Sequence, residues 1–170
     1  MDASNDLERA WVAVYVRAHH EQHVANQLRF YGYEPFLPSY VKTSTRKSRL
    51  PTPLFPGYVF CRYVLHPVFR IIQIPGVIRI LSHGRVPAVL TESEIETIQR
   101  MASLEDHVEP WRFPQIGQRV RITGGPLRGI EGILVNLENR LRMVVAVSLL
   151  RRAVAVKVVA EQLALVPEHA

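Results

Sequence analysis

The side chains best suited to chemistry lie in a histidine-rich segment near the N-terminus, where His19, His20 and His23 surround Glu21. The segment from His20 to His23 is one residue shorter than the His-Glu-x-x-His pattern of zinc peptidases. His19 and His23 supply only two of the four ligands that a structural zinc site needs. We therefore expect no metal here. Together with Arg17, these side chains at a helix start suit phosphate groups, and the alternative is a solvated helix end.

No other residues form a recognisable catalytic set. Cys61 is the only cysteine, so it can form no internal disulfide, and we interpret it as a packing residue in a protein of a reducing compartment. The glycines at 124 and 125 are not followed by the Gly-Lys-Ser/Thr of a phosphate-binding loop. We expect a protein that is not an enzyme, needs no cofactor, spans no membrane and works in the cytoplasm.

The charge of the chain favours contact with an acidic partner. The formal net charge is +6, and it is unevenly distributed. Lys and Arg exceed Asp and Glu in residues 1–103 and again in 116–167, whereas residues 104–115 carry one basic and three acidic side chains. Two basic blocks separated by an acidic spacer fit a protein that works near nucleic acid.

The first block alternates predicted strands and helices. Residues 11–17 are β-branched and aromatic, which predicts a strand, and residues 20–31 carry apolar side chains at helical spacing before Gly32. The remaining predicted elements are strands at 36–41, at 54–64 with a break at 56–57, and at 77–81, a short helix at 67–72, and a helix opened by the capping box Thr91–Glu94. This order indicates an α+β fold with a mainly antiparallel sheet.

The second block follows a segment without periodicity, residues 104–115, which we interpret as a linker. Short β-branched stretches at 120–122, 130–135, 141–147 and 153–159 are separated by turn signals, and no helical pattern interrupts them. Several short strands within about 50 residues indicate a small β-barrel.

Two motifs in these blocks resemble those of one family. Residues 117–135 are similar to the KOW motif, and Leu54–Phe60, Pro75–Leu81 and the 94–98 helix resemble the NGN domain of NusG-type transcription elongation factors. The resemblance implies an NGN domain at 9–103, an α/β sandwich with a mainly antiparallel sheet. It also implies a linker at 104–115 and a KOW domain at 116–168, a small SH3-like five-stranded barrel. Tyr33–Pro38 and Leu149–Val156 resemble specialised paralogs of the UpxY and RfaH kind more than the housekeeping factor.

The resemblance implies a contact function rather than catalysis. In this family the NGN domain docks on the clamp helices of the RNA polymerase β′ subunit, suppresses pausing and so acts in elongation and antitermination. The residues that this implies for the contact are Tyr15, Phe55, Tyr58 and Phe60, with Pro56-Gly57 turning Tyr58 outward; the alternative for Phe60 is a core position. Residues 66–70 correspond to the contact with the β-subunit gate loop. They hold Pro67-Val68-Phe69 in place of the hydroxyl-rich residues of relatives.

Nucleic acid and a second partner complete the implied contacts. Arg17, His19, His20 and His23 correspond to the end that faces the non-template DNA strand. Lys42, Arg46, Lys47 and Arg49 lie in the family's variable hairpin, with a charged mobile loop as the alternative. In the barrel, Leu149, Leu150, Arg151 and Arg152 occupy the loop that in NusG contacts Rho or a small-subunit ribosomal protein. This sequence lacks the aromatic and the glycine of the housekeeping pattern there. We expect a monomer.

Two alternatives stay open from the sequence. KOW barrels also occur in ribosomal proteins, so a ribosome-associated or RNA-binding module is the second hypothesis. Some RfaH-like paralogs refold this domain as a helical hairpin. The valines at 143–147 and 154–159 favour strands, so we expect a constitutive barrel.

Overall fold

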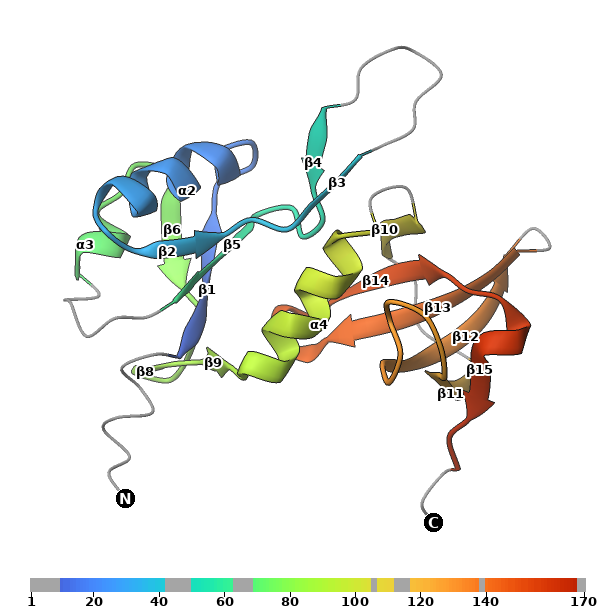
Figure 1. The fold of residues 1–170 in the computed structure, drawn as a ribbon. Coiled ribbons are helices and arrows are strands. Elements are labelled where there is room, and N and C mark those ends of the chain that lie inside the picture. The colour runs from blue at the N-terminus through green and yellow to red at the C-terminus, as the bar shows by residue number, and fades with distance from the viewer. Residues whose placement is uncertain are drawn as a thin grey trace. The chain divides into compact units, whose positions relative to one another are not determined.

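The structure is a computed structural model that describes residues 10–41, 50–62, 69–104, 107–111, 117–137 and 140–167. It divides into two compact units (Figure 1). Unit 1 comprises residues 1–38 and 55–96, and unit 2 comprises residues 39–54 and 97–170. The domain boundaries expected from the sequence, at 103 and 116, stay a prediction.

Unit 1 is built on an antiparallel sheet whose central strand is β1 (Trp11–Val16). The strand order is β2-β5-β1-β6, and β9 also pairs with β1. The other strands are β2 (Glu34–Phe36), β5 (Tyr58–Arg62), β6 (Val77–Ile80) and β9 (Val89–Leu90). The strands predicted at 11–17 and 77–81 are confirmed. Of the strand predicted at 54–64, residues 58–62 form β5, residues 54–57 form a bend and turn, and 63 and 64 lie outside the described residues. The prediction of one strand at 36–41 is wrong, because β2 ends at Phe36 and residues 39–41 form a strand of another sheet.

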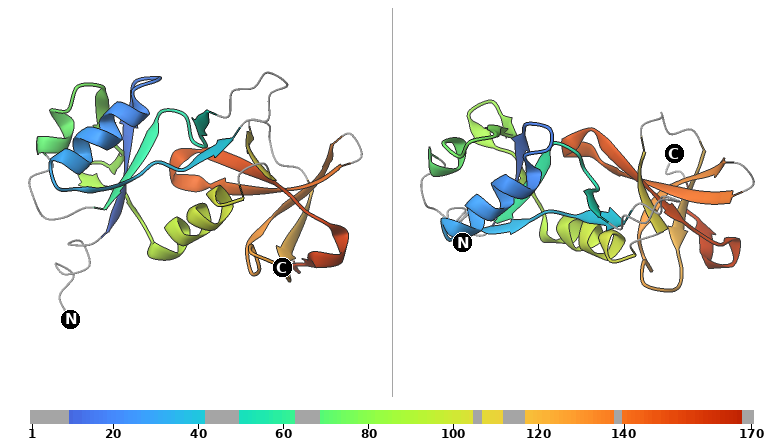
Figure 2. Two further views of the ribbon diagram at one scale, coloured as in Figure 1. Left: turned by 45° about the horizontal axis from the view of Figure 1, so that its top comes forward. Right: turned by 90° about the horizontal axis from the view of Figure 1, so that it is seen from above.

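Two helices cover one face of this sheet. α2 (Glu21–Phe30) and α3 (Phe69–Ile72) confirm the predicted helices as far as the described residues reach. Val24 and Leu28 of α2 and Ile71 of α3 pack with the valines at 12, 14 and 16 in one buried cluster. Figure 2 shows α2 lying against the strands of unit 1. The apolar stripe of the α2 sequence therefore forms the core of this unit.

α4 (Glu92–Ala102) begins at the predicted capping box. The Thr91 backbone N–H donates to Glu94 Oε2 at 2.8 Å, and the Glu94 N–H donates to Thr91 Oγ1 at 3.2 Å. Ile95, Ile98 and Met101 are buried, as their spacing predicted. A two-stranded hairpin, β7 (Ser82–His83) and β8 (Val86–Pro87), precedes the helix and was not predicted. None of the helices in the described part of the chain has the length and apolarity to cross a membrane.

Unit 2 contains a six-stranded antiparallel sheet in the order β10-β14-β13-β12-β11-β15. Its predicted strands are β11 (Gln118–Ile122), β12 (Glu131–Leu137), β13 (Arg140–Val147) and β14 (Arg152–Lys157). Two further strands were missed, β10 (Val108–Trp111) and β15 (Leu163–Leu165). β10 lies within the segment that we interpreted as an irregular linker, and it pairs with β14 from Val108 to Trp111. A second, two-stranded sheet joins β3 (Ser39–Val41) to β4 (Pro51–Pro53).

The α+β class predicted from the sequence is confirmed, and the valine-rich stretches expected to be strands lie in β13 and β14. Gly132 shows why a glycine stands inside β12. A Cβ at this position would lie 2.4 Å from the Val144 carbonyl oxygen of the neighbouring strand. Only glycine lets β12 and β13 approach this closely.

Candidate functional site

The two faces of the unit 1 sheet have different chemistry. Side chains alternate along a strand, so Val12, Val14 and Val16 of β1 point to the helix-covered face, which we call the aliphatic face. Trp11, Ala13 and Tyr15 point to the opposite one. Through the strand register, that face also holds Phe36, Tyr58, Phe60, Arg62 and Arg79. We call it the aromatic face.

One cross-strand row of the aromatic face combines two tyrosines and an arginine. Tyr15 pairs with Tyr58 of β5 on one side and with Arg79 of β6 on the other. The two tyrosine rings have centroids 5.3 Å apart, and the Arg79 guanidinium carbon lies 5.9 Å from the centroid of the Tyr15 ring. Tyr15 is half-buried and Arg79 is exposed. This row, the Tyr58–Tyr15–Arg79 row, presents aromatic surface and a positive charge at one end of the sheet.

Gly57 makes room for the row. Its φ is +87°, and a Cβ there would lie 3.2 Å from Cε2 of Tyr15. The Gly57 carbonyl oxygen accepts the Val16 N–H at 2.8 Å, and the Gly57 N–H donates to Oε1 of Glu21 at 2.9 Å. Glu21 is a buried carboxylate, and it therefore ties the start of α2 to the turn before β5. The break predicted at 56–57 thus positions Tyr15.

Three of the four predicted contact aromatics are more deeply buried than we expected. Phe55 is 1% exposed, Phe60 is 0% exposed and Tyr58 is 9% exposed. The Phe60 ring packs against Phe55 at 5.8 Å and against Phe36 at 6.1 Å between centroids. Tyr58 therefore does not turn outward as we expected, Phe55 offers no free surface, and Phe60 takes the core position given as its alternative. Tyr15 is the member of the set that keeps partly exposed surface.

The basic segment after β1 lies beside the row. Arg17, His19, His20 and His23 are all exposed, as phosphate contact requires. The Arg17 N–H donates to the Gly76 carbonyl at 2.8 Å, which fixes the backbone here next to the turn before β6. His19 has a φ of +66°, an uncommon backbone conformation for a residue other than glycine. The described residues contain no group of three or more His, Cys, Asp or Glu side chains placed to hold a metal.

The opposite end of the aromatic face is closed by an ion-pair cluster that the sequence did not reveal. Arg62 Nε lies 3.2 Å from Glu34, and its Nη2 donates to Glu92 at 2.9 Å. The guanidinium stacks over Trp11 at 5.0 Å, and the Trp11 indole N–H donates to the other Glu92 oxygen at 3.1 Å. This cluster fastens the first turn of α4 to the sheet.

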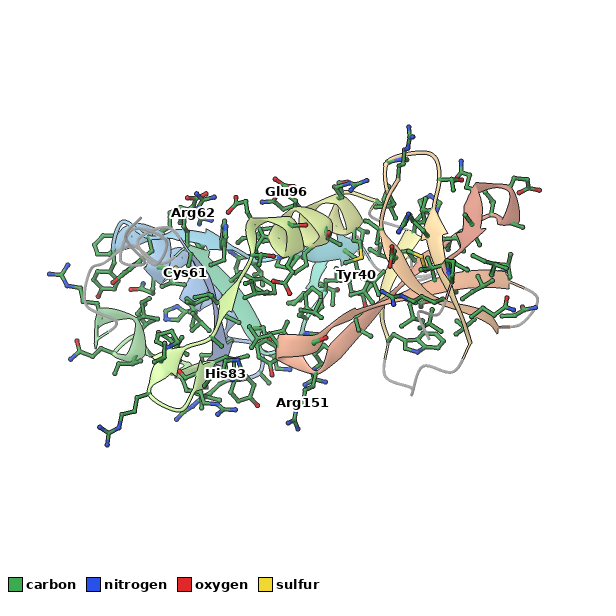
Figure 3. The ribbon with its side chains drawn as sticks, turned by 90° about the horizontal axis from the view of Figure 1, so that it is seen from below. Tyr40, Cys61, Arg62, His83, Glu96 and Arg151 are labelled. Carbon is green, nitrogen blue, oxygen red and sulfur yellow. The ribbon has the colours of Figure 1, made fainter. Side chains whose placement is uncertain are left out.

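Cys61 stands next to Arg62 on β5 but points to the aliphatic face; both are labelled in Figure 3. Burial raises the pKa of its thiol to about 12, and the negative charge of Glu34 adds to this effect. The thiol therefore stays protonated and unreactive at neutral pH. This supports its interpretation as a packing residue.

Of the other predicted contact residues, one group lies outside the described part of the chain and the other lies around the β13–β14 turn. Lys42, Arg46, Lys47 and Arg49, and residues 66–68 of the gate-loop segment, lie outside the described residues. Leu149, Leu150 and Arg151 lie in the turn between β13 and β14, which contains the 3-10 helix η2 (Ser148–Leu150), and Arg152 is the first residue of β14. Leu150 is 3% exposed, which contradicts its use as a free contact, whereas Arg151 and Arg152 are exposed. Arg151 has a φ of +51° and points away from the strands (Figure 3).

Arg79 is the site residue that sequence analysis missed. It lies within a stretch already assigned to a strand, and its period-2 position relative to Ile80 indicated the face opposite the core. The sequence therefore indicated which face of the sheet Arg79 occupies. It did not indicate that Arg79 pairs with Tyr15, because the register between distant strands cannot be read from either segment alone.

Comparisons with known proteins place the chain among transcription factors. Residues 9–99 match the family model described as "Transcription termination factor nusG". The structure described as "Domain interaction in Thermotoga maritima NusG" is similar at a TM-score of 0.64 and 20% identity, over 95% of this chain and 99% of that one. A chain of "Crystal Structure of MjSpt4:Spt5 complex conformation A" aligns over 94% and 99% at 16% identity. Its TM-score of 0.30 does not show a common fold.

Proposed function

This chain belongs to the NusG family of transcription elongation and antitermination factors, and from that premise we propose that the aromatic face of unit 1 docks on RNA polymerase. The observation that carries the proposal is the Tyr58–Tyr15–Arg79 row, with Tyr15 half-buried and Arg79 exposed. The partner surface is the tip of the β′ clamp helices. Tyr15 and Arg79 make the contact, while Tyr58, Phe60 and Phe55 support the Tyr15 side of the face from within.

The chemistry of the row suits this kind of partner. Aromatic side chains anchor interfaces because they bury a large area at a small cost in side-chain entropy. An arginine beside the ring adds a cation that a carboxylate or a carbonyl on a helical hairpin can accept. Gly57 and Glu21 hold the row in place before binding, which lowers the ordering cost on association.

Docking suppresses pausing by a population shift. A factor that binds the closed clamp more tightly than the open clamp lowers the occupancy of paused states in proportion to that difference in affinity. Arg17, His19, His20 and His23 lie exposed after β1, and we assign them to the phosphates of the non-template strand. Lys42, Arg46, Lys47 and Arg49 would extend this contact.

The second domain recruits a further partner. We propose that the boundaries follow the sequence division, with the NGN domain at 9–103 and the KOW domain at 116–168. Arg151 and Arg152 at the exposed tip of the β13–β14 turn offer charge to Rho or to a ribosomal protein. The paralog-like segments Tyr33–Pro38 and Leu149–Val156 favour an operon-specific factor of the UpxY and RfaH kind.

The docking proposal is tested by Tyr15→Ala in a transcription assay on a template with a defined pause. We expect pause suppression to fall by about tenfold in potency, because truncation of a central aromatic anchor costs about 1.4 kcal/mol or more. Tyr31→Ala is the matched control, since Tyr31 is an exposed tyrosine of unit 1 that lies outside the row. Full pause suppression by a folded Tyr15→Ala protein would refute the docking face.

A further inference from the structure

Unit 2 contains a cavity that none of the contacts above uses. Its volume is about 380 Å³, within the range of pockets that take small ligands or single side chains. The walls are formed by residues that follow α4, by the β11–β12 turn and by the segment after β14. The lining residues used below are Ile122, Leu127, Lys157, Val159, Gln162 and Leu163.

The walls are held by hydrogen bonds rather than by packing alone. The Arg100 side chain donates to the Pro126 carbonyl at 3.0 and 2.8 Å and to the Arg128 carbonyl at 2.7 Å. These three bonds fasten the β11–β12 turn to α4. The Thr123 N–H donates to the Gln162 carbonyl at 2.8 Å, which joins the other two walls. A pocket fixed in this way is formed before its ligand arrives, which favours binding.

The lining is mainly aliphatic, with His107 and Gln162 as polar members and Lys157 as a cation. Ile122, Leu127 and Leu163 supply aliphatic surface, and Val159 is 52% exposed. Lys157 supplies an ammonium group. Among the described residues no carboxylate lies within ion-pair distance of it. No Asp or Glu belongs to the lining; Glu161 stands next to Gln162 in the 3-10 helix η3 (Ala160–Gln162) but lies outside it.

Two carboxylates of this sheet are already paired with arginines. Arg142, the cross-strand neighbour of Lys157, is paired with Glu109, at 3.4 Å. On β11, Arg119 and Arg121 share Glu131 and lower the pKa of that carboxyl, so this acidic group is already paired as well. An apolar hollow beside an uncompensated cation is complementary to an aliphatic group that carries a negative charge.

We propose that this cavity binds an acidic peptide segment of a partner protein, with a leucine-sized side chain in the hollow and an adjacent carboxylate on Lys157. The inference deepens the proposed function, because it names the chemistry of the partner that the second domain recruits. It adds a contact at the Lys157 cavity to the one proposed for the β13–β14 turn.

The test is a titration of the isotope-labelled full chain with two six-residue peptides, followed by backbone amide resonances. One peptide has two central leucines flanked by aspartates, and the other carries asparagines in place of the aspartates. We expect shifts at Ile122, Leu127 and Leu163, and about fivefold tighter binding of the acidic peptide, the size expected for a partly exposed ion pair.

Variants separate the two parts of the contact. Lys157→Gln should bind both peptides equally, whereas Arg140→Gln, which removes an exposed cation of β13 outside the lining, should keep the fivefold preference. Val159→Trp places a large ring on an exposed lining position and should abolish the shifts.

Equal affinity for the two peptides, shifts confined to other residues or no binding at millimolar peptide would each overturn the proposal. The titration contains no polymerase, so its failure leaves the docking proposal intact. A failed Tyr15→Ala test would likewise leave the peptide result intact.

Discussion

The two faces of the unit 1 sheet come from the same five strands, yet they differ in almost every physical respect. The aliphatic face consists of valines with Cys61, sealed by α2 and α3, and its members are buried. The aromatic face carries rings, arginines and glutamates, and its exposure changes along its length. At Arg62 it is closed onto Glu34 and Glu92, and at Arg79 it is exposed.

This difference shows how one strand can serve stability and recognition together. Alternate residues of β1 belong to different faces, so Val14 and Tyr15 are neighbours in the chain but have unrelated surroundings. The aliphatic side gains its free energy from burial, which is insensitive to partners. The aromatic side keeps ring edges and charges that a partner can use. We therefore expect substitutions on the first face to lower stability and those on the open end of the second to lower polymerase binding.

The largest expected effect on stability comes from the aliphatic face. Leu28→Ala removes a fully buried side chain from the cluster of α2 and the valines, and we expect the free energy of unfolding to fall by about 3 kcal/mol. Urea denaturation followed by circular dichroism measures the change. In the same assay, Tyr15→Ala should lower the free energy of unfolding by a markedly smaller amount. If the two variants were equally unstable, the distinction between the faces would be lost.

Gly57→Ala tests the geometry that joins the faces. The positive φ and the contact with the Tyr15 ring should together lower the free energy of unfolding by about 2 kcal/mol. Gly32→Ala is the matched control, because Gly32 has a similar φ of +85° and a Cβ at that position would meet no atom within 4 Å. The additional loss in the free energy of unfolding of Gly57→Ala over that of Gly32→Ala measures the crowding against the Tyr15 ring. Identical losses would show that the ring does not depend on Gly57.

Arg62→Met breaks the closed end of the aromatic face. It removes two ion pairs and a cation–π contact at a partly exposed site, so we expect a loss of about 1 kcal/mol in the free energy of unfolding. Arg29→Met, on the exposed side of α2, serves as the control, and thermal unfolding in low salt compares the two. A greater loss for the Arg29 variant would contradict the role of the cluster.

The smallest effect at neutral pH concerns Cys61. Its folded pKa of about 12 lies above the ordinary value of 9.0, so its contribution to stability is complete below pH 9 and is lost as the pH rises toward 12. We expect iodoacetamide to leave the native thiol unmodified at pH 8 and to alkylate it once urea unfolds the chain. Cys61→Ala should show a weaker decline of stability between pH 9 and 12. Rapid alkylation of the native protein would place the thiol at the surface.

Much of this fold could be predicted from the sequence because its signals are local. The Thr91–Glu94 capping box, the apolar stripe of α2 and the β-branched stretches of unit 2 each specify an element by themselves. β10 and β15 escaped prediction because each is short and depends on a partner strand for its hydrogen bonds. Pro110 within β10 also argued against a strand.

The candidate site could be predicted only in part. Residue type and resemblance both indicated Tyr15 and the basic segment from Arg17 to His23; Tyr15 is half-buried and Arg17, His19, His20 and His23 are exposed, and their contacts stay predictions. The burial of Phe55 and Leu150 was missed and that of Phe60 was only an alternative, since an apolar residue has the same pattern whether it faces a partner or its own core. Arg79 was missed because its role depends on strand register, which is a long-range property.

The most direct test of the docking face is a photocrosslink from its open end. A photoreactive phenylalanine in place of Tyr15 should form an adduct with the β′ subunit when the protein is irradiated with core polymerase. The same probe in place of Phe30, which is 80% exposed on α2, should form none. An adduct from position 30, together with no adduct from position 15, would contradict the proposed docking face.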